Sequence, residues 1–157
     1  MIQAEVKHTG PLTVAFKVMK GSYSETPTGF QQLYEWVEHY GLQPAGMPQA
    51  LYLTIPGETP EGEAEWELWA PIAGGSGETG PDESGFGVKR LEPEALAAAV
   101  HKGPYEQVGT VYRELLEWIG DHGYQVVGPP REVYMTDPDE VPPEEYLTEV
   151  QMPVMKV

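Results

Sequence analysis

The chain has 157 residues, 40% of them hydrophobic, so it can bury a core and is not expected to be disordered. Its formal net charge of −16 repels a phosphate backbone, which predicts no direct contact with nucleic acid. The absence of cysteine excludes disulfides, thiolate metal sites and cysteine nucleophiles. The lack of a long apolar run or a signal-peptide pattern predicts a cytoplasmic protein without a membrane partner.

The first half of the chain predicts a β-α-β-β unit. Extended stretches at residues 2–7 and 12–19, separated by Pro11, are two strands or one long bent strand. An amphipathic helix follows, with apolar residues at three- and four-residue spacing from Phe30 to Tyr40, and it ends at Gly41. Strands at residues 50–54 and 65–72 flank a proline- and acid-rich turn at residues 56–63, which favours an antiparallel hairpin.

The second half predicts the same order of elements. Strands are expected at residues 86–91 and 96–101, although the alanines within residues 95–99 also suit a helix. We favour a strand because this segment aligns with residues 13–17 of the first half. A helix from Tyr112 to His122 ends at Gly123, and strands at residues 132–136 and 147–154 flank a second turn at residues 138–145.

An internal repeat explains this likeness. Shifted by 82 positions, residues 2–72 align without a gap with residues 84–154, and 24 of the 71 pairs are identical, against about one in fifteen by chance. Residues 73–83 then form a flexible linker, and residues 1–157 are predicted to be one domain. We therefore predict an α+β fold in which the two repeats are related by a pseudo-two-fold axis. One antiparallel sheet and two helices would flank a central groove.

Glu67 and Glu149 are the first candidates for a functional site. They occupy matching places in the last strand of each half, and strand alternation puts Glu67 on the same face as Trp69. Solvated positions on an outer face would explain both acids equally well. A carboxylate walled by aromatic rings could instead accept a cationic ligand, or act as a general base with a raised pKa.

Aromatic residues supply the other candidates for ligand binding. Each is most simply explained as a core residue, but 4 tryptophans and 9 tyrosines exceed what a core of this size needs, and such rings often line ligand sites. The candidates are Tyr105, Trp118, Tyr134, Trp66 and Trp69, and the pattern does not decide which of the last two faces the groove.

Histidine and serine patterns add little. The four histidines have no paired spacing, so neither a metal nor another cofactor is predicted, although His101 could line the groove. The glycine- and serine-rich residues 74–77 lack the lysine and the strand-to-helix context of a phosphate-binding loop.

Three segments of the second half resemble a known family: HKGPY at residues 101–105, REVYMTDP at residues 131–138 and TEVQMPV at residues 148–154. They are similar to the GyrI-like small-molecule-binding domain, found in the effector-binding domains of bacterial multidrug-sensing transcription activators. The resemblance covers essentially the whole chain and implies the same repeated β-α-β-β fold. It also implies a site for bulky cationic or planar compounds, with an acid matched by Glu149 at its base and a neighbouring tyrosine matched by Tyr134.

The resemblance and the residues leave three hypotheses for function. The leading one is a stand-alone binding module for an amphipathic, aromatic or cationic small molecule, because the chain contains no predicted helix-turn-helix segment. The second is a hydrolase of strained, cyclopropane-type electrophiles, as in some stand-alone family members, with Glu149 or Glu67 activating water. The third, implied by the gyrase-inhibitor branch of the family, is a protein-interaction module. The sequence leaves the natural ligand and the oligomeric state open.

Overall fold

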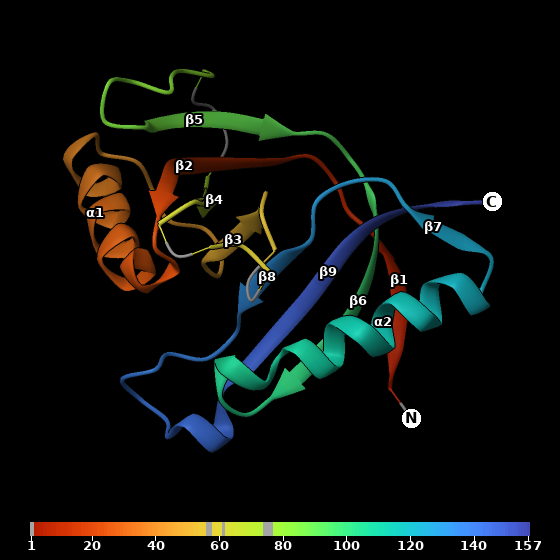
Figure 1. The fold of residues 1–157 in the computed structure, drawn as a ribbon. Coiled ribbons are helices and arrows are strands. Elements are labelled where there is room, and N and C mark those ends of the chain that lie inside the picture. Colours follow the sequence, from red (N-terminus) through yellow and green to blue (C-terminus); the bar gives the residue numbers. More distant parts are fainter. Residues whose placement is uncertain (1, 56–57, 61, 74–76) are drawn as a thin grey trace. The chain divides into compact units, whose positions relative to one another are not determined.

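The computed structural model describes residues 2–55, 58–60, 62–73 and 77–157 (Figure 1). Parts of the predicted turn at 56–63 and of the predicted linker at 73–83, namely residues 56–57, 61 and 74–76, lie outside the described residues. The chain forms two compact units. Unit 1 comprises Met1–Gly10 and Pro93–Val157, and unit 2 comprises Pro11–Glu92.

Unit 2 contains an antiparallel sheet and one long helix. Its strand order is β3-β4-β2-β5, and the helix α1 packs against β2 and β4 through the buried side chains of Leu33 and Val37. The elements in chain order are β2 (Leu12–Gly21), the short 3-10 helix η1 (Tyr23–Glu25), α1 (Thr26–His39), β3 (Gln49–Tyr52), β4 (Ala64–Ile72) and β5 (Phe86–Leu91).

Unit 1 repeats this plan with the strand order β1-β6-β9-β8, and its helix α2 packs against β6 and β9. The short strand β7 pairs with the end of β9 and was not predicted. The elements are β1 (Ala4–His8), β6 (Ala95–Lys102), η2 (Tyr105–Gln107), α2 (Gly109–Asp121), β7 (Tyr124–Val126), β8 (Arg131–Tyr134), η3 (Pro143–Glu145) and β9 (Leu147–Lys156).

The predicted α+β fold with an antiparallel sheet and two helices is confirmed. The alanine-rich segment at residues 95–99 lies in β6, where Ala97 and Ala99 are buried beneath α2 and the strand pairs with β1 along one edge and with β9 along the other. Burial in the sheet therefore overrides the helix propensity of alanine. Both helices end as expected, with Gly41 and Gly123 following their last turns at φ values of 67° and 79°. The pseudo-two-fold arrangement, the groove and the domain boundaries stay predictions.

The first strand of each sequence repeat does not join the unit formed by the rest of that repeat. β1, from the first repeat, pairs with β6, so that His8 lies opposite Ala95. β5, from the second repeat, pairs with β2, so that Leu12 lies opposite Leu91. The two extended stretches of each repeat are thus separate strands rather than one bent strand. Each unit consists of most of one repeat together with the first strand of the other.

Alternation along the strands gives each sheet a helix side and an opposite side. In unit 1 the helix side carries the apolar cluster of Ala97, Ala99, Val150, Met152 and Val154 with Leu115 and Ile119 of α2. In unit 2 it carries Met19 and Leu68, which come so close to Gly29 of α1 that an added Cβ would lie 2.7 Å from each. Phe16, Val14 and Trp69 cluster on the opposite side of unit 2.

Candidate functional site

A buried carboxylate lies on the helix side of unit 1. Glu132, in β8, is only 5% exposed. The Tyr112 hydroxyl, from α2, donates to its Oε2 atom over 2.7 Å, and the Tyr134 hydroxyl, from the same strand, donates to its Oε1 atom over 3.2 Å. These contacts hold the acid between the helix and the sheet. No lysine or arginine of the described residues forms an ion pair with it.

The environment of Glu132 favours its neutral form. Burial raises the pKa of this carboxyl, because a charge loses its hydration in the protein interior. The hydrogen bonds from Tyr112 and Tyr134 and the nearby His101 imidazole act in the opposite direction but do not cancel the effect of burial on the pKa. A buried acid that has a raised pKa and no lysine or arginine ion pair is typical of binding and catalytic sites.

Aromatic rings and a histidine extend the site around this acid. The ring of Tyr105 meets that of Tyr134 edge to face, with centroids 5.6 Å apart, and stacks on that of Tyr146 at 4.7 Å. Burial and the charges of neighbouring groups raise the pKa of Tyr105. His101 and Tyr134 are both opposite Thr148 in the strand register, so these three side chains share the helix side. Glu132, Tyr112, Tyr134, Tyr105 and His101 are called the Glu132 cluster below.

The matching positions of unit 2 carry apolar side chains. Shifting each residue by 82 positions replaces Glu132 by Ala50, Tyr112 by Phe30, His101 by Met19 and Thr148 by Trp66. Trp66 is fully buried and its ring lies 4.8 Å from that of Tyr23. The two repeats therefore place a polar cluster in unit 1 where unit 2 has an apolar core, and the burial of so many polar atoms in unit 1 needs a reason beyond folding.

Glu149 and Glu67, the predicted acids, lie on the sides of their sheets opposite the helices. Glu149 accepts hydrogen bonds from Lys7 of β1 over 2.8 Å and from the Gln151 amide over 2.6 Å. Glu67 is paired with Lys89 of β5 and accepts a hydrogen bond from the indole nitrogen of Trp69 over 2.8 Å. Lys7 and Lys89 match under the 82-residue shift. Each predicted acid is thus neutralised by a lysine from the strand that the other repeat supplies.

The predicted tryptophans serve as packing residues in the described structure. Trp66 is on the helix side of unit 2 and Trp69 on the opposite side, where the Lys89 ammonium lies 5.2 Å from its ring centroid. Trp118 packs against the apolar cluster beneath α2, and its ring stacks on that of His122 at 4.1 Å.

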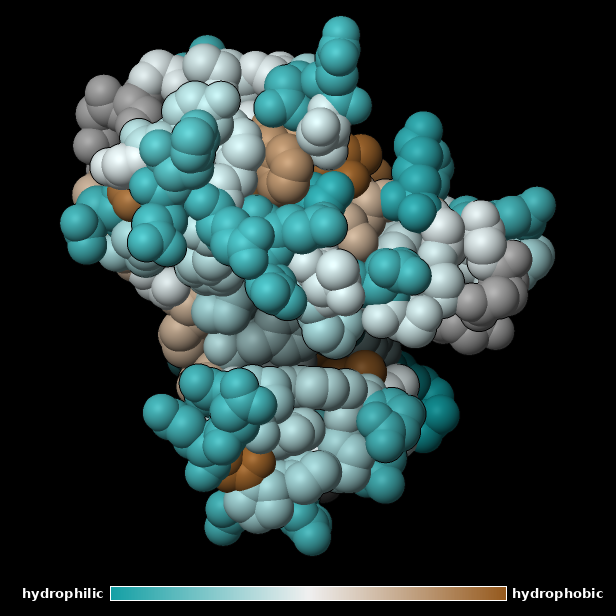
Figure 2. Space-filling view, turned by 90° about the vertical axis from the view of Figure 1, so that its left-hand side faces the viewer, coloured by the Kyte–Doolittle hydropathy of each residue, from teal (hydrophilic) through white to brown (hydrophobic). Residues whose placement is uncertain are grey.

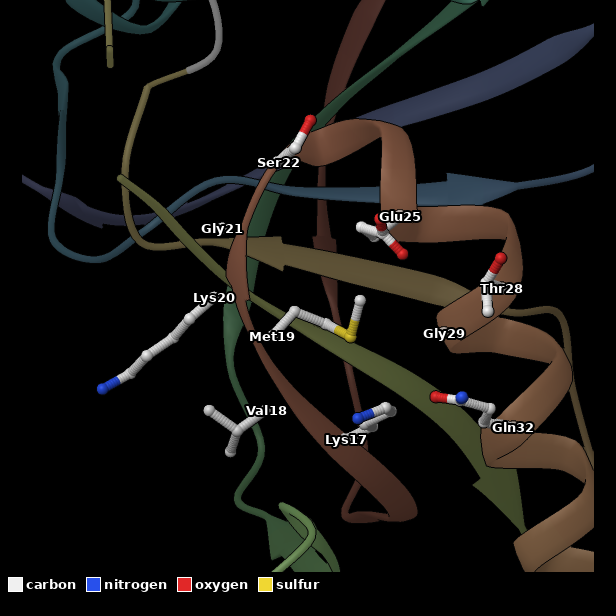
Figure 3. Close-up of a pocket in the computed structure, with 10 residues that line it drawn as sticks. All are labelled: Lys17, Val18, Met19, Lys20, Gly21, Ser22, Glu25, Thr28, Gly29 and Gln32. Atoms are coloured by element: carbon white, nitrogen blue, oxygen red, sulfur yellow. The ribbon is translucent and has the colours of Figure 1, made fainter. Parts of the chain in front are cut away.

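Two hollows flank α1 in unit 2. One, of about 460 Å³, lies between β2 and α1, and Figure 3 shows Lys17 and Gln32 in the space between these elements while Lys20 points away. The other, of about 450 Å³, is lined by Trp36 and Phe86, whose rings stack with centroids 5.6 Å apart. Both are open to solvent, and the acids and the histidine among their lining residues, Glu25, Glu35 and His39, are exposed, so the Glu132 cluster is the stronger candidate.

The described part of the chain contains neither a metal-binding cluster nor a membrane-spanning helix. Among the described residues, no three histidine, aspartate or glutamate side chains lie close enough together to hold a metal ion. None of the described helices is long and apolar enough to span a membrane. The face in Figure 2 is predominantly hydrophilic with small hydrophobic areas, in keeping with the excess of acidic residues.

Comparison with protein families identifies the family of this chain. The model of the GyrI-like small molecule binding domain matches residues 3–155, nearly the whole chain. The chain belongs to the GyrI-like family. The resemblance seen in the sequence is therefore confirmed, and the protein is a small-molecule-binding domain of the GyrI-like type.

Solved structures share this GyrI-like fold. EcmrR in complex with DNA superposes with a TM-score of 0.83 at 24% identity; the match covers 99% of this chain and 58% of that chain, so our protein spans just over half of it. The isolated EcmrR C-terminal domain gives 0.78 at 23% identity, covering 100% of this chain and 99% of that one.

Two further neighbours are more distant. A hydrolase from Listeria innocua gives a TM-score of 0.74 at 15% identity, covering 98% of this chain and 92% of that chain. SAV2435 bound to tetraphenylphosphonium gives a TM-score of 0.59 at 16% identity, and the match covers 98% of this chain and 94% of that chain. Because the sequence identities are below 25%, these structural matches establish the fold alone. No curated protein sequence matches the chain significantly.

Of the predicted site residues of this GyrI-like domain, the structure brings Tyr105 and Tyr134 together. Glu149 is on the other side of the same sheet, Trp118 is a half-buried residue of α2 that packs against the apolar cluster, and Glu67, Trp66 and Trp69 belong to unit 2. Their roles in ligand binding stay predictions. Sequence reasoning missed Glu132 and Tyr112. The signal that could have found Glu132 is its place two residues before Tyr134, on the same face of the same strand, where the first repeat has Ala50.

Proposed function

We propose that this GyrI-like domain binds an amphipathic, aromatic and cationic small molecule at the Glu132 cluster. The observation that supports it is a buried carboxylate held by two tyrosine hydroxyls without a lysine or arginine partner among the described residues. A positively charged ligand would provide the missing counter-charge. It would also lower the pKa of Glu132, because an opposite charge favours the ionised form.

Each neighbouring side chain has a defined part in this proposal. The rings of Tyr105 and Tyr134 provide flat apolar surface and cation–π contact for an aromatic cation. Tyr112 and Tyr134 orient the carboxylate through their hydroxyls. Contact with about 150 Å² of apolar ligand surface contributes roughly 4 kcal/mol before the costs of association. Micromolar affinity corresponds to about 8 kcal/mol, so it requires at least as large a contribution from the charge contact with Glu132.

Glu149, the acid first predicted to select charge, is the natural control for this proposal. It is about as buried as Glu132 and lies in the same sheet, but Lys7 already neutralises it. A ligand selected by an unpaired buried charge should therefore depend on Glu132 and not on Glu149. The two glutamates can be compared with the same isosteric change to glutamine.

Isothermal titration with tetraphenylphosphonium tests the proposal, with tetraphenylborate as an anion of similar shape. We expect the native chain to bind the cation and not the anion, Glu132→Gln to weaken cation binding at least tenfold, and Glu149→Gln to change it less than twofold. Equal affinity of Glu132→Gln and the native chain for the cation would refute the role of Glu132. A reversed order of the two variants would restore Glu149 as the selecting acid.

Hydrolysis of a strained electrophile is the second candidate function, and the raised pKa of Glu132 favours it. A carboxyl group whose pKa is raised is, once ionised, a stronger base that can accept a proton from water and return it to a leaving group. The tyrosine rings would then position the substrate and exclude solvent. Turnover of a cyclopropane-bearing compound by the native chain, lost in Glu132→Gln, would support this function, whereas binding without product would leave the binding function alone.

A further inference from the structure

β1 has a free hydrogen-bonding edge in unit 1. It pairs with β6 on one side, and no other strand of the described part of unit 1 pairs with it. The backbone N–H of Thr9 donates to the carbonyl of Glu94 in β6 over 2.8 Å. Because bonded pairs alternate along an antiparallel ladder, Lys7 and Glu5 also face β6. The backbone groups of Ala4, Val6 and His8 therefore point away from β6.

The matching strand β5 of unit 2 has the same edge, but its own chain covers it. The outward positions that match Ala4, Val6 and His8 are Phe86, Val88 and Arg90. Val88 and Thr79 exchange backbone hydrogen bonds of 2.9 and 3.0 Å. The carbonyl of Phe86 accepts from the Asp82 N–H, the Phe86 N–H donates to the Asp82 side chain, and the Arg90 N–H donates to the Glu78 side chain.

The edge of β1 lacks the covering segment that the edge of β5 has. Residues 78–82 satisfy the outward N–H groups at all three positions of β5, and no described residue of unit 1 does the same for β1. An uncovered strand edge of this kind is a template for pairing with another strand. Within the described residues of each unit, the β5 edge is covered by its own chain and the matching β1 edge is not.

The sequence of β1, AEVKH, is complementary to itself when two copies run antiparallel about Val6. Val6 then faces Val6 of the second copy, and Ala4 faces His8. Glu5 of each copy lies directly opposite Lys7 of the other, so both cross-strand pairs join opposite charges. Any shift of this register by two residues loses these pairs. Val6 is an outward-facing position, which is what the centre of such a ladder requires.

Apolar side chains beside this edge would gain contacts in the same arrangement. Ile2, Ala4 and Val6 are only half-buried, and they pack against the apolar cluster beneath α2. In this register Val6 of the second copy would pack against Val6, and its His8 would lie beside Ala4. The contact is short, so the association is expected to be weak and dependent on protein concentration.

We propose that two copies of this chain associate through β1, antiparallel and centred on Val6, to form a two-fold symmetric dimer with a sheet continuous across the interface. Identical patches meet in such an interface, as two-fold symmetry requires. The site of the Glu132 cluster takes no part in this contact, and the inference does not depend on the proposed function.

Sedimentation equilibrium between about 10 µM and about 1 mM tests the proposal on the purified chain. We expect dimer to form with rising concentration. Glu5→Lys places a lysine opposite Lys7 twice and should weaken the dimer at least tenfold. Glu83→Lys changes the net charge equally at an exposed position of unit 2 and should have no effect. Val6→Pro removes an outward N–H without touching the ladder to β6 and should also prevent association.

Amide hydrogen exchange supplies a measurement that is independent of variants. The Val6 and His8 amides should exchange more slowly at high protein concentration, while the Val88 amide, already bonded to Thr79, should not change. A chain that remains monomeric at 1 mM would overturn the proposal. A dimer that survives both Glu5→Lys and Val6→Pro, in chains with native circular dichroism, would overturn it equally.

Discussion

Replacing Lys89 by methionine should destabilise the protein by about 2–3 kcal/mol. Lys89 is paired with Glu67, and its ammonium lies 4.8 Å from the ring centroid of Phe16 and 5.2 Å from that of Trp69. Breaking a fully buried ion pair costs about 3–5 kcal/mol because a charge is left without a partner. The Lys89 side chain is 31% exposed and that of Glu67 12%, so solvent reduces this to about 2 kcal/mol. Loss of the cation–π contacts adds about 0.5–1 kcal/mol.

Lys7→Met is the matched comparison. Lys7 makes the equivalent ion pair with Glu149, but its side chain is 41% exposed and its ammonium lies over no aromatic ring of the described residues. Screening by solvent lowers the expected loss to about 1 kcal/mol. Urea unfolding, followed by tryptophan fluorescence, measures both free energies of unfolding. The double variant Lys89→Met with Glu67→Gln should recover most of the loss, because it leaves no buried charge unpaired.

The order of the two losses tests the reasoning. If Lys7→Met costs as much as or more than Lys89→Met, burial and ring contacts do not set the strength of these pairs. If the double variant is no more stable than Lys89→Met alone, the loss comes from packing and not from an unpaired carboxylate.

Three further outcomes follow from the structure. Burial raises the pKa of Glu132, so the folded native chain loses stability as the pH rises through that pKa. Glutamine does not titrate. The free energy of unfolding of Glu132→Gln, measured relative to that of the native chain by urea titration, should therefore increase from about pH 4 to about pH 7.5. Tyr112→Phe removes a hydrogen bond that lowers the pKa of Glu132, so this pKa should rise further in an NMR titration, and an unchanged value would contradict the contact. Gly87→Ala would bring a Cβ against the carbonyl oxygen of Thr79 and to 2.6 Å from the ring of Phe16. The clash should lower the free energy of unfolding by about 1–3 kcal/mol and speed amide exchange along the β5 edge. Unchanged exchange would show that residues 78–82 adapt freely.

The sequence determined the local structure of this protein and its family. The gap-free match of residues 2–72 with residues 84–154 assigned residues 95–99 to a strand against their helix propensity. Glycine at positions 41 and 123 marked the ends of both helices, because only a residue without a side chain adopts a positive φ there at little cost. Apolar spacing gave the buried faces of the helices, and three short segments gave the GyrI-like family.

The choice of partners for each charge was decided only by the tertiary structure. Glu149 and Glu132 are both acids in apolar strands of the second half, and a pattern of alternation cannot distinguish an acid that meets a lysine from one that does not. Lys7 reaches Glu149 because β1 pairs with β6, a partner nearly 90 residues away along the chain. Tyr112 reaches Glu132 because α2 packs over the sheet. Local sequence fixes side-chain direction and periodicity, whereas the burial and pairing that shift a pKa depend on contacts between distant segments, which form only when the chain folds.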